Sequence, residues 1–414
     1  MYESKKPNLL ILGASGGVGS ALLIYLSHHR KSFDNIVLLD KSKGILANKF
    51  VDHARLNYIF INKALSFPKD TLEYKNILKN HLINIVIDVV SDDNLQTFEI
   101  TNEMGVNYIN TSINGPSKTH EHIFDIWNKR DKLNNAAHIL CTGMNPGIVN
   151  MWARFGIEKF GVPKQIIIFE YDTSKTAKKI PLVTWSIEYF LEEIAEIPSM
   201  MMLGRNNVKE LFPNALANRV DMKKILKPIL KLDEYPEGCI VPHDEVVSLA
   251  QKYNVSSSFI YSINKHTMET LIRIYKEKGK VNHNELLLGD NTNIVLEGSD
   301  KIGIILEYED KRVYYFNSFA NISVVGTNAT YTQVVIGVIA ALFTLIYDNL
   351  PKGTYFVEDL YDTYYEHYVF EKMQVQEFVF SKEKNRLRLM KYDPEIRLEK
   401  LKKSEKDLTK KTEE

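Results

Sequence analysis

The feature that most constrains the fold is the stretch NLLILGASGGVGSALLIYL, Asn8 to Leu26. It reads as an apolar strand, a glycine-rich turn and a helix, which is the order that a dinucleotide-binding fold requires. Gly13 allows the tight turn, Gly16 lets the backbone approach a diphosphate, and Gly19 lets the helix pack closely on the strand. The stretch therefore predicts a dinucleotide site whose loop is formed by these glycines together with Ser15, Gly17 and Val18.

The next predicted strand ends in an acid, Asp40, about 20 residues further on. At this position a carboxylate binds the ribose hydroxyls of the adenosine. NAD is favoured over NADP because Asp40 would repel a 2′-phosphate, although Lys41 and Lys43 leave NADP as the alternative. The competing interpretation of the glycine pattern is a packing turn in another kind of parallel-sheet protein.

The first 150 residues alternate between short apolar runs and amphipathic stretches such as TLEYKNILKN and HIFDIWNKRDKL. This alternation predicts an α/β fold with a doubly wound parallel sheet of Rossmann type, in a dinucleotide-binding domain of residues 1–150. Six strands are expected, at Asn8–Gly13, Asn35–Asp40, Ala64–Pro68, Asn84–Val90, Asn107–Thr111 and Ala137–Thr142.

The rest of the chain has a different texture, with β-rich runs such as QIIIFEYD, KIGIILEYED and RVYYFNSF interrupted by helical patterns. We expect an α+β domain for substrate binding and dimerisation at 151–325. A long apolar helix begins near Thr330, and the segment 326–380 is expected to pack back on the first domain. Residues 381–414 are rich in Lys and Glu, which predicts a charged tail that is a solvated helix or disordered.

The charge balance argues against several classes of partner. Lys+Arg and Asp+Glu both number 52, so no overall field favours nucleic acid or an anionic membrane. The most apolar run, Val334–Tyr347, is shorter than the roughly 20 residues that span a bilayer. Cys141 and Cys239 show no metal-ligand spacing. These features predict a cytoplasmic protein without a metal site.

Polar side chains follow three of the predicted strands of the first domain: Asp92, Asn114 and Asn145 come after the fourth, fifth and sixth. Ligands of such sheets lie beyond the carboxyl ends of the strands. In CTGMNPG, Pro146 restricts the backbone of Asn145, and Gly147 permits a backbone conformation that other residues resist. Its amide is therefore expected to point at the nicotinamide end of the cofactor or at a substrate beside it.

Acidic and aromatic residues are concentrated in the stretch FEYDTSKTAKKIPLVTWSIEYFLEE, which carries Glu170, Trp185 and Glu193. Trp185 and Glu193 are spaced to share one face of a helix. A core tryptophan and a solvated glutamate are the alternative.

Two later stretches carry further candidates. In GCIVPHDEVVSLA, His243, Asp244 and Glu245 stand at a predicted helix start, where either acid could simply cap the helix. In VLEGSDKIGIIL, Asp300 is expected in a turn before a strand.

The motifs GASGGVG, CTGMNPGIV, TWSIEYFLEE, GCIVPHDEVVSLA, EGSDKIGIIL and NATYTQVVIGVIAAL together resemble the bacterial homospermidine synthases, within the saccharopine dehydrogenase-like group. They stand in the family's order and cover roughly residues 7–370. The resemblance implies a homodimeric NAD enzyme that condenses two putrescine molecules to homospermidine with release of ammonia, by borrowing and returning a hydride. It also implies a site lined by Asn145, Glu170, Trp185, Glu193, His243, Glu245 and Asp300.

The chemistry of a diamine agrees with this set. A diamine is a dication at neutral pH, so its pocket needs carboxylates, and an indole such as that of Trp185 attracts an ammonium by a cation–π interaction. His243 is the expected base that removes a proton from the amine. The other acids are expected to position amines, and Asn145 to orient the reacting carbon.

The chain departs from the family in two places: Asn114 stands where the family has an acid, and the glycine loop is GxxGxxG instead of GxGxxG. One alternative is a saccharopine or carboxyspermidine-type dehydrogenase, whose carboxylate substrates would require Arg or Lys in the cleft. The other is a non-catalytic dinucleotide-binding sensor, which Asn114 favours.

Overall fold

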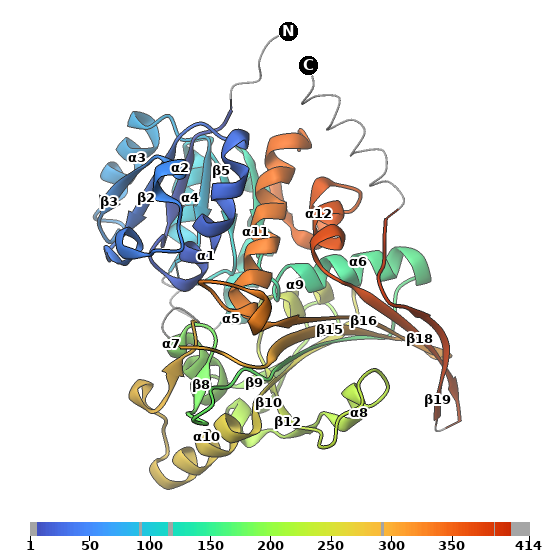
Figure 1. Cartoon of the computed structure of the whole chain (residues 1–414). Helices are drawn as coiled ribbons and strands as arrows, with labels where there is room; N and C mark the ends of the chain where they lie inside the picture. Colours follow the sequence, from blue (N-terminus) through green and yellow to red (C-terminus); the bar gives the residue numbers. More distant parts are fainter. Residues whose placement is uncertain (1–5, 91–92, 115–118, 291–293, 385, 399–414) are drawn as a thin grey trace.

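The computed structural model describes residues 6–90, 93–114, 119–290, 294–384 and 386–398. Two β-sheets dominate it, and both are covered by helices (Figure 1). The helices in the described part are α1 (Gly17–Leu26), α2 (His53–Leu56), α3 (Thr71–Asn80), α4 (Leu95–Glu103), α5 (Thr119–Lys129), α6 (Ile148–Phe160), α7 (Ile187–Leu191), α8 (Lys223–Leu226), α9 (Asp244–Tyr253), α10 (Lys265–Lys278), α11 (Ala329–Tyr347) and α12 (Tyr364–Lys372).

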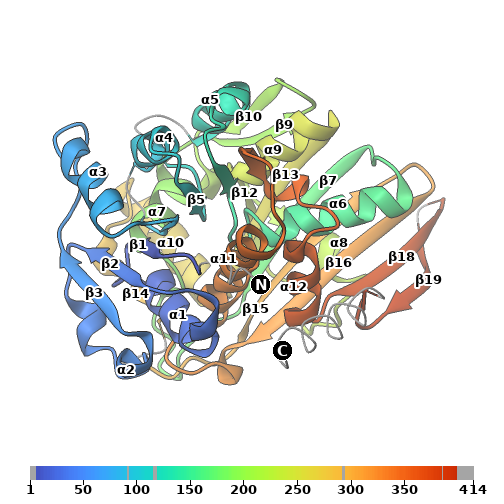
Figure 2. The same cartoon turned by 90° about the horizontal axis from the view of Figure 1, so that it is seen from above.

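The first sheet is parallel throughout and confirms the doubly wound α/β class. Its order is β17 (Gly353–Phe356), β6 (Ala137–Leu140), β5 (Asn107–Asn110), β4 (Ile85–Asp88), β1 (Leu9–Leu12), β2 (Ile36–Asp40) and β3 (Tyr58–Asn62). Helices α1 and α11 lie on one face and α3 and α4 on the other (Figure 2). The central strand β1 is buried on both faces, which explains its uninterrupted apolar sequence.

Two details of this sheet differ from expectation. The third strand is Tyr58–Asn62 and not Ala64–Pro68. The run Tyr-Ile-Phe-Ile has aromatic and β-branched side chains that suit a strand, whereas Pro68 has no N–H group to give to a ladder. The sheet also has a seventh strand, β17, which comes from the C-terminal part of the chain and pairs with β6.

The second sheet is mixed. Its strands run in the order β10 (Val208–Phe212), β9 (Ser199–Leu203), β13 (Ser256–Ile263), β7 (Gln165–Asp172), β15 (Ser299–Glu307), β16 (Lys311–Ala320), β18 (Gln376–Glu383) and β19 (Arg386–Asp393). Beside this row, β12 (Glu237–Val241) pairs with β13 and β11 (Val220–Asp221), and β8 (Leu182–Val183) pairs with β14 (Leu287–Leu288).

The charged C-terminal region is neither a helix nor disordered over residues 381–384 and 386–393, contrary to expectation. Residues 381–383 complete β18, and Arg386–Asp393 form the edge strand β19. Leu387 and Leu389 alternate with the basic residues Arg386, Arg388 and Lys391 in part, and the edge position leaves most of these side chains exposed. Residues 399–414 lie outside the described part.

The apolar helix α11 is a core element. By length and composition it is long enough to cross a membrane, yet 83% of its most apolar window is buried inside the protein. It contacts α1 and β5 of the first sheet, β15 and β16 of the second, and α12. Its N-terminal end therefore lies where the two sheets meet.

Candidate active site

The carboxyl end of β1 carries the glycine loop. Gly13 adopts φ +82°, in the left-handed region that glycine tolerates, and Gly16 precedes the first residue of α1. A methyl group on Gly19 would lie 2.2 Å from the carbonyl oxygen of Gly13, so helix and loop pack too closely for any side chain. No side chain caps α1 and its first turn has no acid, which leaves the helix start suited to a phosphate.

Asp40 braces this loop. Its carboxylate accepts a hydrogen bond of 2.8 Å from the backbone N–H of Ser15 and one of 2.7 Å from that of Ser42. The Ser15 hydroxyl in turn donates to the carbonyl of Ser42 at 2.8 Å. The end of β2 and the glycine loop are thus held together where the adenosine of a dinucleotide would lie, and the loop fits such a cofactor.

A cavity of about 450 Å³ opens beside the loop, between the two sheets. Its volume is in the range typical of small-molecule sites. Nine of the predicted site residues line it: Gly16, Gly17, Val18, Asn114, Asn145, Glu170, Trp185, Glu193 and His243. The glycine loop and the acidic residues of the second domain therefore face one space.

The amide of Asn145 points at a carboxylate. Its Nδ2 donates to Oε2 of Glu170 on β7 at 2.6 Å. The turn that presents Asn145 is tight, because a methyl group on Gly147 would lie 2.1 Å from the carbonyl oxygen of Gly143. Burial and the neighbouring Asp300 raise the pKa of Glu170 well above its usual value. The pair joins the end of β6 to the second sheet.

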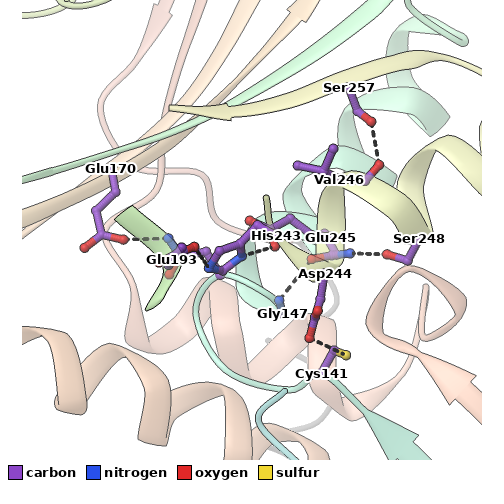
Figure 3. Close-up of polar contacts among 12 residues, drawn as sticks. Cys141, Gly147, Glu170, Glu193, His243, Asp244, Glu245, Val246, Ser248 and Ser257 are labelled. Atoms are coloured by element: carbon purple, nitrogen blue, oxygen red, sulfur yellow. Dashed lines mark hydrogen bonds and ion pairs between the residues drawn. The ribbon is translucent and has the colours of Figure 1, made fainter. Parts of the chain in front are cut away.

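His243 lies between two glutamates (Figure 3). Its Nε2 is 3.4 Å from Oε1 of Glu193, and its Nδ1 makes a short hydrogen bond to Glu245. Burial alone would lower the pKa of His243, but the two carboxylates outweigh it and raise this pKa to about 9. Burial raises the pKa of Glu193 to about 7. This pKa lies above the value near the working pH that was expected of a base.

Asp244 does not cap helix α9, although the sequence allowed it; His243 is the residue before the first turn. Oδ2 of Asp244 accepts from the backbone N–H of Ile113 at 3.0 Å and from the Cys141 thiol at 3.7 Å (Figure 3). Burial raises the pKa of Asp244 to about 6. This carboxyl ties the helix that carries His243 to the strand ends of the first sheet.

Trp185 precedes α7 and does not share a helix face with Glu193, because Ser186 starts that helix by accepting from the N–H of Tyr189. The five-residue π-helix Glu192–Glu196 then carries Glu193. The indole N–H of Trp185 donates to the hydroxyl of Tyr261 at 3.1 Å. Since both Trp185 and Glu193 line the cavity, the expected juxtaposition is reached by a different local structure.

Asp300 is the second residue of β15 and is fully buried, so the expectation of a turn is wrong. The strand extends this far because Asp300 pairs with Asp172 of β7 on one side and Phe319 of β16 on the other. Asp300 does not line the cavity, but it lies behind Glu170. Burial and Asp172 raise the pKa of Asp300 to about 8.

The cavity lining does not include Gly13, Ser15, Gly19, Asp40 or Glu245. The first three belong to the glycine loop, Asp40 ends β2, and Glu245 lies behind His243. Asp92 lies outside the described residues. Sequence reasoning missed Asp172, Thr184, Tyr261, Thr330 and Tyr331 as members of this region. Thr184, Thr330 and Tyr331 stand within motifs already noted, next to Trp185 and in NATYTQ, but nothing in their spacing singles them out.

Four acids line the cavity: Glu170, Glu192, Glu193 and Asp244. In the described part of the chain, no Lys or Arg lines the cavity. Five buried carboxyl oxygens have no hydrogen-bond partner among the described residues, and four of them belong to candidate site residues or their neighbours: Oε1 of Glu170, Oδ1 of Asp244, Oε1 of Glu245 and Oδ1 of Asp300. Each of these carboxyl groups has a partner at its other oxygen. Glu170 and Asp244 line the cavity, and an unsatisfied buried carboxyl oxygen there suits a cationic ligand. No metal-binding group of His, Cys, Asp and Glu occurs in the part that the structure describes.

A comparison with known protein families agrees with the dinucleotide-binding fold of the first domain. Residues 9–140 match the family described as saccharopine dehydrogenase NADP binding domain. A homospermidine synthase from Mesorhizobium japonicum is 23% identical over 410 residues, covering 79% of this chain and 81% of that protein. These similarities support a nicotinamide dinucleotide cofactor and leave NAD and NADP both open.

Solved structures of dehydrogenases align over most of the chain. The apo scyllo-inositol dehydrogenase from Lactobacillus casei covers 89% of this chain and 94% of its own, with 12% identity and a TM-score of 0.42. The WlbA dehydrogenase from Thermus thermophilus, in complex with NAD and alpha-ketoglutarate, covers 84% and 96%, with 8% identity and a TM-score of 0.35.

Proposed function

We propose that this protein is an NAD-dependent aminoalkyl transferase of the homospermidine synthase type, which condenses two putrescines, or putrescine and another polyamine, with release of ammonia. The observation that carries the proposal is the acidic cavity that begins at the glycine loop and ends at Trp185, Glu170 and Glu193. A diamine neutralises these buried acids, and its carbon chain suits the apolar part of the wall. The similarity to the Mesorhizobium homospermidine synthase adds support.

The amine would be held by charge and by an aromatic face. An ammonium over the indole of Trp185 gains roughly 1 to 2 kcal/mol when it is desolvated. Glu170 and Glu193 then give charge-assisted hydrogen bonds to its N–H groups. Asn145 holds Glu170 in place through its 2.6 Å hydrogen bond, so the position of the amine follows from that of the turn.

Proton removal depends on the charge of the ligand. A substrate ammonium beside Glu193 and His243 competes for the same carboxylates, so its arrival lowers the pKa of His243 from about 9. His243 then becomes able to release and accept a proton within the closed site. When bound, NAD supplies the acceptor and donor of a hydride at the carbon next to the amine.

A saccharopine or carboxyspermidine-type dehydrogenase is the weaker candidate. Its substrates carry carboxylates, and no Lys or Arg is found among the described residues that line the cavity. The sensor alternative depends on Asn114, which lines the cavity and donates to the hydroxyl of Ser112 at 3.2 Å. An amide there weakens the hold on one amine, but it leaves the cluster around His243 complete.

The test is an assay of the purified protein with NAD or NADP and putrescine dideuterated at both carbons next to its amines. We expect ammonia and homospermidine that retains all its label, with no accumulation of reduced cofactor. Stoichiometric reduced cofactor with an aldehyde or amino-acid product would instead support the dehydrogenase. Dinucleotide binding without any product from any diamine would support the sensor.

A further inference from the structure

From the cavity wall at Thr330 inward, four buried side-chain oxygens, two from aspartates and two from threonines, form a continuous row at hydrogen-bond distances. Oδ2 of Asp172 lies 2.7 Å from Oγ1 of Thr184, which lies 2.9 Å from Oγ1 of Thr330, which lies 2.8 Å from Oδ2 of Asp300. All four side chains are at most 3% exposed. The row joins β7, the segment before Trp185, the start of α11 and β15.

The number of protons in this row decides its state. Each of the three separations is a hydrogen-bond distance and needs one proton. The two threonine hydroxyls supply one proton each, and an ionised carboxylate supplies none. With both acids ionised, one of the three contacts would set two oxygen acceptors against each other in a buried place. One further proton, carried by one of the two aspartates, gives each of the three contacts its hydrogen bond.

The partners of the two acids show which of them carries it. Asp172 has a donor at each oxygen, because its Oδ1 accepts from the N–H of Ser174 at 2.7 Å. Asp300 has an unpartnered Oδ1, and apart from Thr330 its carboxyl receives only the amide of Gln333 at 3.1 Å. The ionised form is therefore better satisfied at Asp172. The row then runs from Asp300 as donor through Thr330 and Thr184 to the Asp172 carboxylate.

We propose that Asp172, Thr184 and Thr330 act as positioning residues that keep Asp300 protonated by sharing a single proton along this row. The other titratable groups that act on the pair are Glu170 on β7, Lys301 on β15 and Tyr261 on β13. Burial raises the pKa of both aspartates, in agreement with one proton held between them.

The consequence for the cavity concerns Glu170. Among the neighbouring charged groups, an ionised Asp300 opposes the ionisation of Glu170 most strongly. A neutral Asp300 lets Glu170 ionise and hold an ammonium, without moving any residue of the cavity wall. This use of the row rests on the proposed function, whereas the shared proton itself does not.

The experiment is ¹³C NMR of the free protein labelled at the aspartate carboxyl carbon, titrated with pH. Asp172→Asn and Asp300→Asn assign the two signals. In the wild-type protein we expect Asp300 to be protonated and Asp172 ionised at pH 7. An ionised Asp300 at pH 7 would overturn the proposal. The measurement needs neither substrate nor turnover, so its failure is distinct from failure of the proposed function.

The decisive variant is Thr184→Val, because Thr184 touches Asp172 and Thr330 but makes no hydrogen bond to Asp300 among the contacts described. Without its hydroxyl, Thr330 donates to Asp300 alone, and Asp172 loses a donor and takes up the proton. Both changes lower the titration midpoint of Asp300, by an expected one pH unit or more. Thr184→Ser keeps a hydroxyl and should preserve the midpoint.

The matched control is Thr344→Val, which removes an equally buried hydroxyl of α11 that donates to the carbonyl of Ala340. It should leave Asp300 unchanged. A midpoint that is the same in Thr184→Val as in the wild type would show that the row is packing alone. Should Thr184→Val fail to fold, the wild-type titration still decides the protonation state of Asp300.

Discussion

At the scale of the residue, the acids near the cavity differ in their surroundings, even where two of them, Asp244 and Glu245, are neighbours in the sequence. Glu193 lines the cavity, and Glu245 is buried behind His243 with a hydrogen bond to it. Asp244 accepts a hydrogen bond from the backbone of Ile113, beyond the end of β5. The sequence predicted most of these side chains near a site, because each stands in a short motif at an element boundary. It could not predict the partner of each carboxyl group, since those partners come from other elements.

Trp185 gives the first test at this scale. Trp185→Ala should raise the KM for putrescine by about tenfold or more, since an aromatic face contributes roughly 1 to 2 kcal/mol to a desolvated ammonium. Trp185→Phe keeps an aromatic ring but loses the N–H group that donates to Tyr261, so its KM for putrescine should lie between those of the wild type and Trp185→Ala. Steady-state kinetics measure this order. Equal KM values for the alanine variant and the wild type would mean that Trp185 is only part of the core.

His243 gives a second test, on stability. Its pKa is raised from 6.5 to about 9, so its contribution is fully present below pH 6.5 and is lost as the pH rises through 9. The raised pKa corresponds to about 3 kcal/mol at most. Urea unfolding between pH 6 and 9.5 should show a smaller pH-dependent loss for His243→Gln than for the wild type. His266→Gln, at an exposed position, is the control; parallel curves for all three proteins would contradict the ion-pair assignment.

At the scale of the element, the units with local signals were predictable. The strand, glycine turn and helix of residues 8–26 appear as expected, because the apolar run, the glycines and the helix are all local. Asp300 shows the opposite case. Gly-Ser-Asp is typical of a turn, yet pairing with β7 and β16 extends the strand through it. The sequence did not predict the edge strand β19, because the many Lys and Glu residues around it indicate a solvated helix or a disordered segment.

The contact between the glycine loop and α11 gives a test at this scale. A methyl group on Gly17 would lie 2.2 Å from the ring of Tyr331. Gly17→Ala should therefore displace Tyr331, cost about 1 to 3 kcal/mol of stability and weaken dinucleotide binding. Calorimetric titration with NAD and NADP measures the second effect. Gly353→Ala, whose added methyl group has no neighbour nearer than 3.5 Å, should bind as the wild type does. Unchanged dinucleotide binding by Gly17→Ala would mean that Tyr331 can move aside without disturbing the glycine loop.

At the scale of the whole molecule, the polypeptide passes between the two sheets more than once. Helix α11 contacts both, and β17 returns to the first sheet after β16 has completed most of the second. The sequence predicted that residues 326–380 pack back on the first domain. It did not predict a strand there, because the four residues Gly353–Phe356 show no period of their own and gain their structure from β6.

Phe356 tests this junction. Its side chain is fully buried, so Phe356→Ala should cost about 3 to 5 kcal/mol of unfolding free energy. Hydrogen exchange should speed up at the amides of Ala137–Leu140 in β6, which is far from Phe356 in sequence but pairs with its strand. Ile322→Ala, at a position 90% exposed, should change neither quantity. Unchanged exchange in β6 would show that β17 is dispensable to the first sheet.

The return of β17 also affects how the chain folds during synthesis. Strand β6 leaves the ribosome more than 200 residues before Gly353–Phe356, the strand that covers its free edge. Until then the nascent first domain carries an open strand edge, and open edges pair readily with other chains. Because the missing contact is so distant in sequence, its closure comes late and slowly. The amino-terminal part alone should therefore depend on chaperones in a way that the finished protein does not.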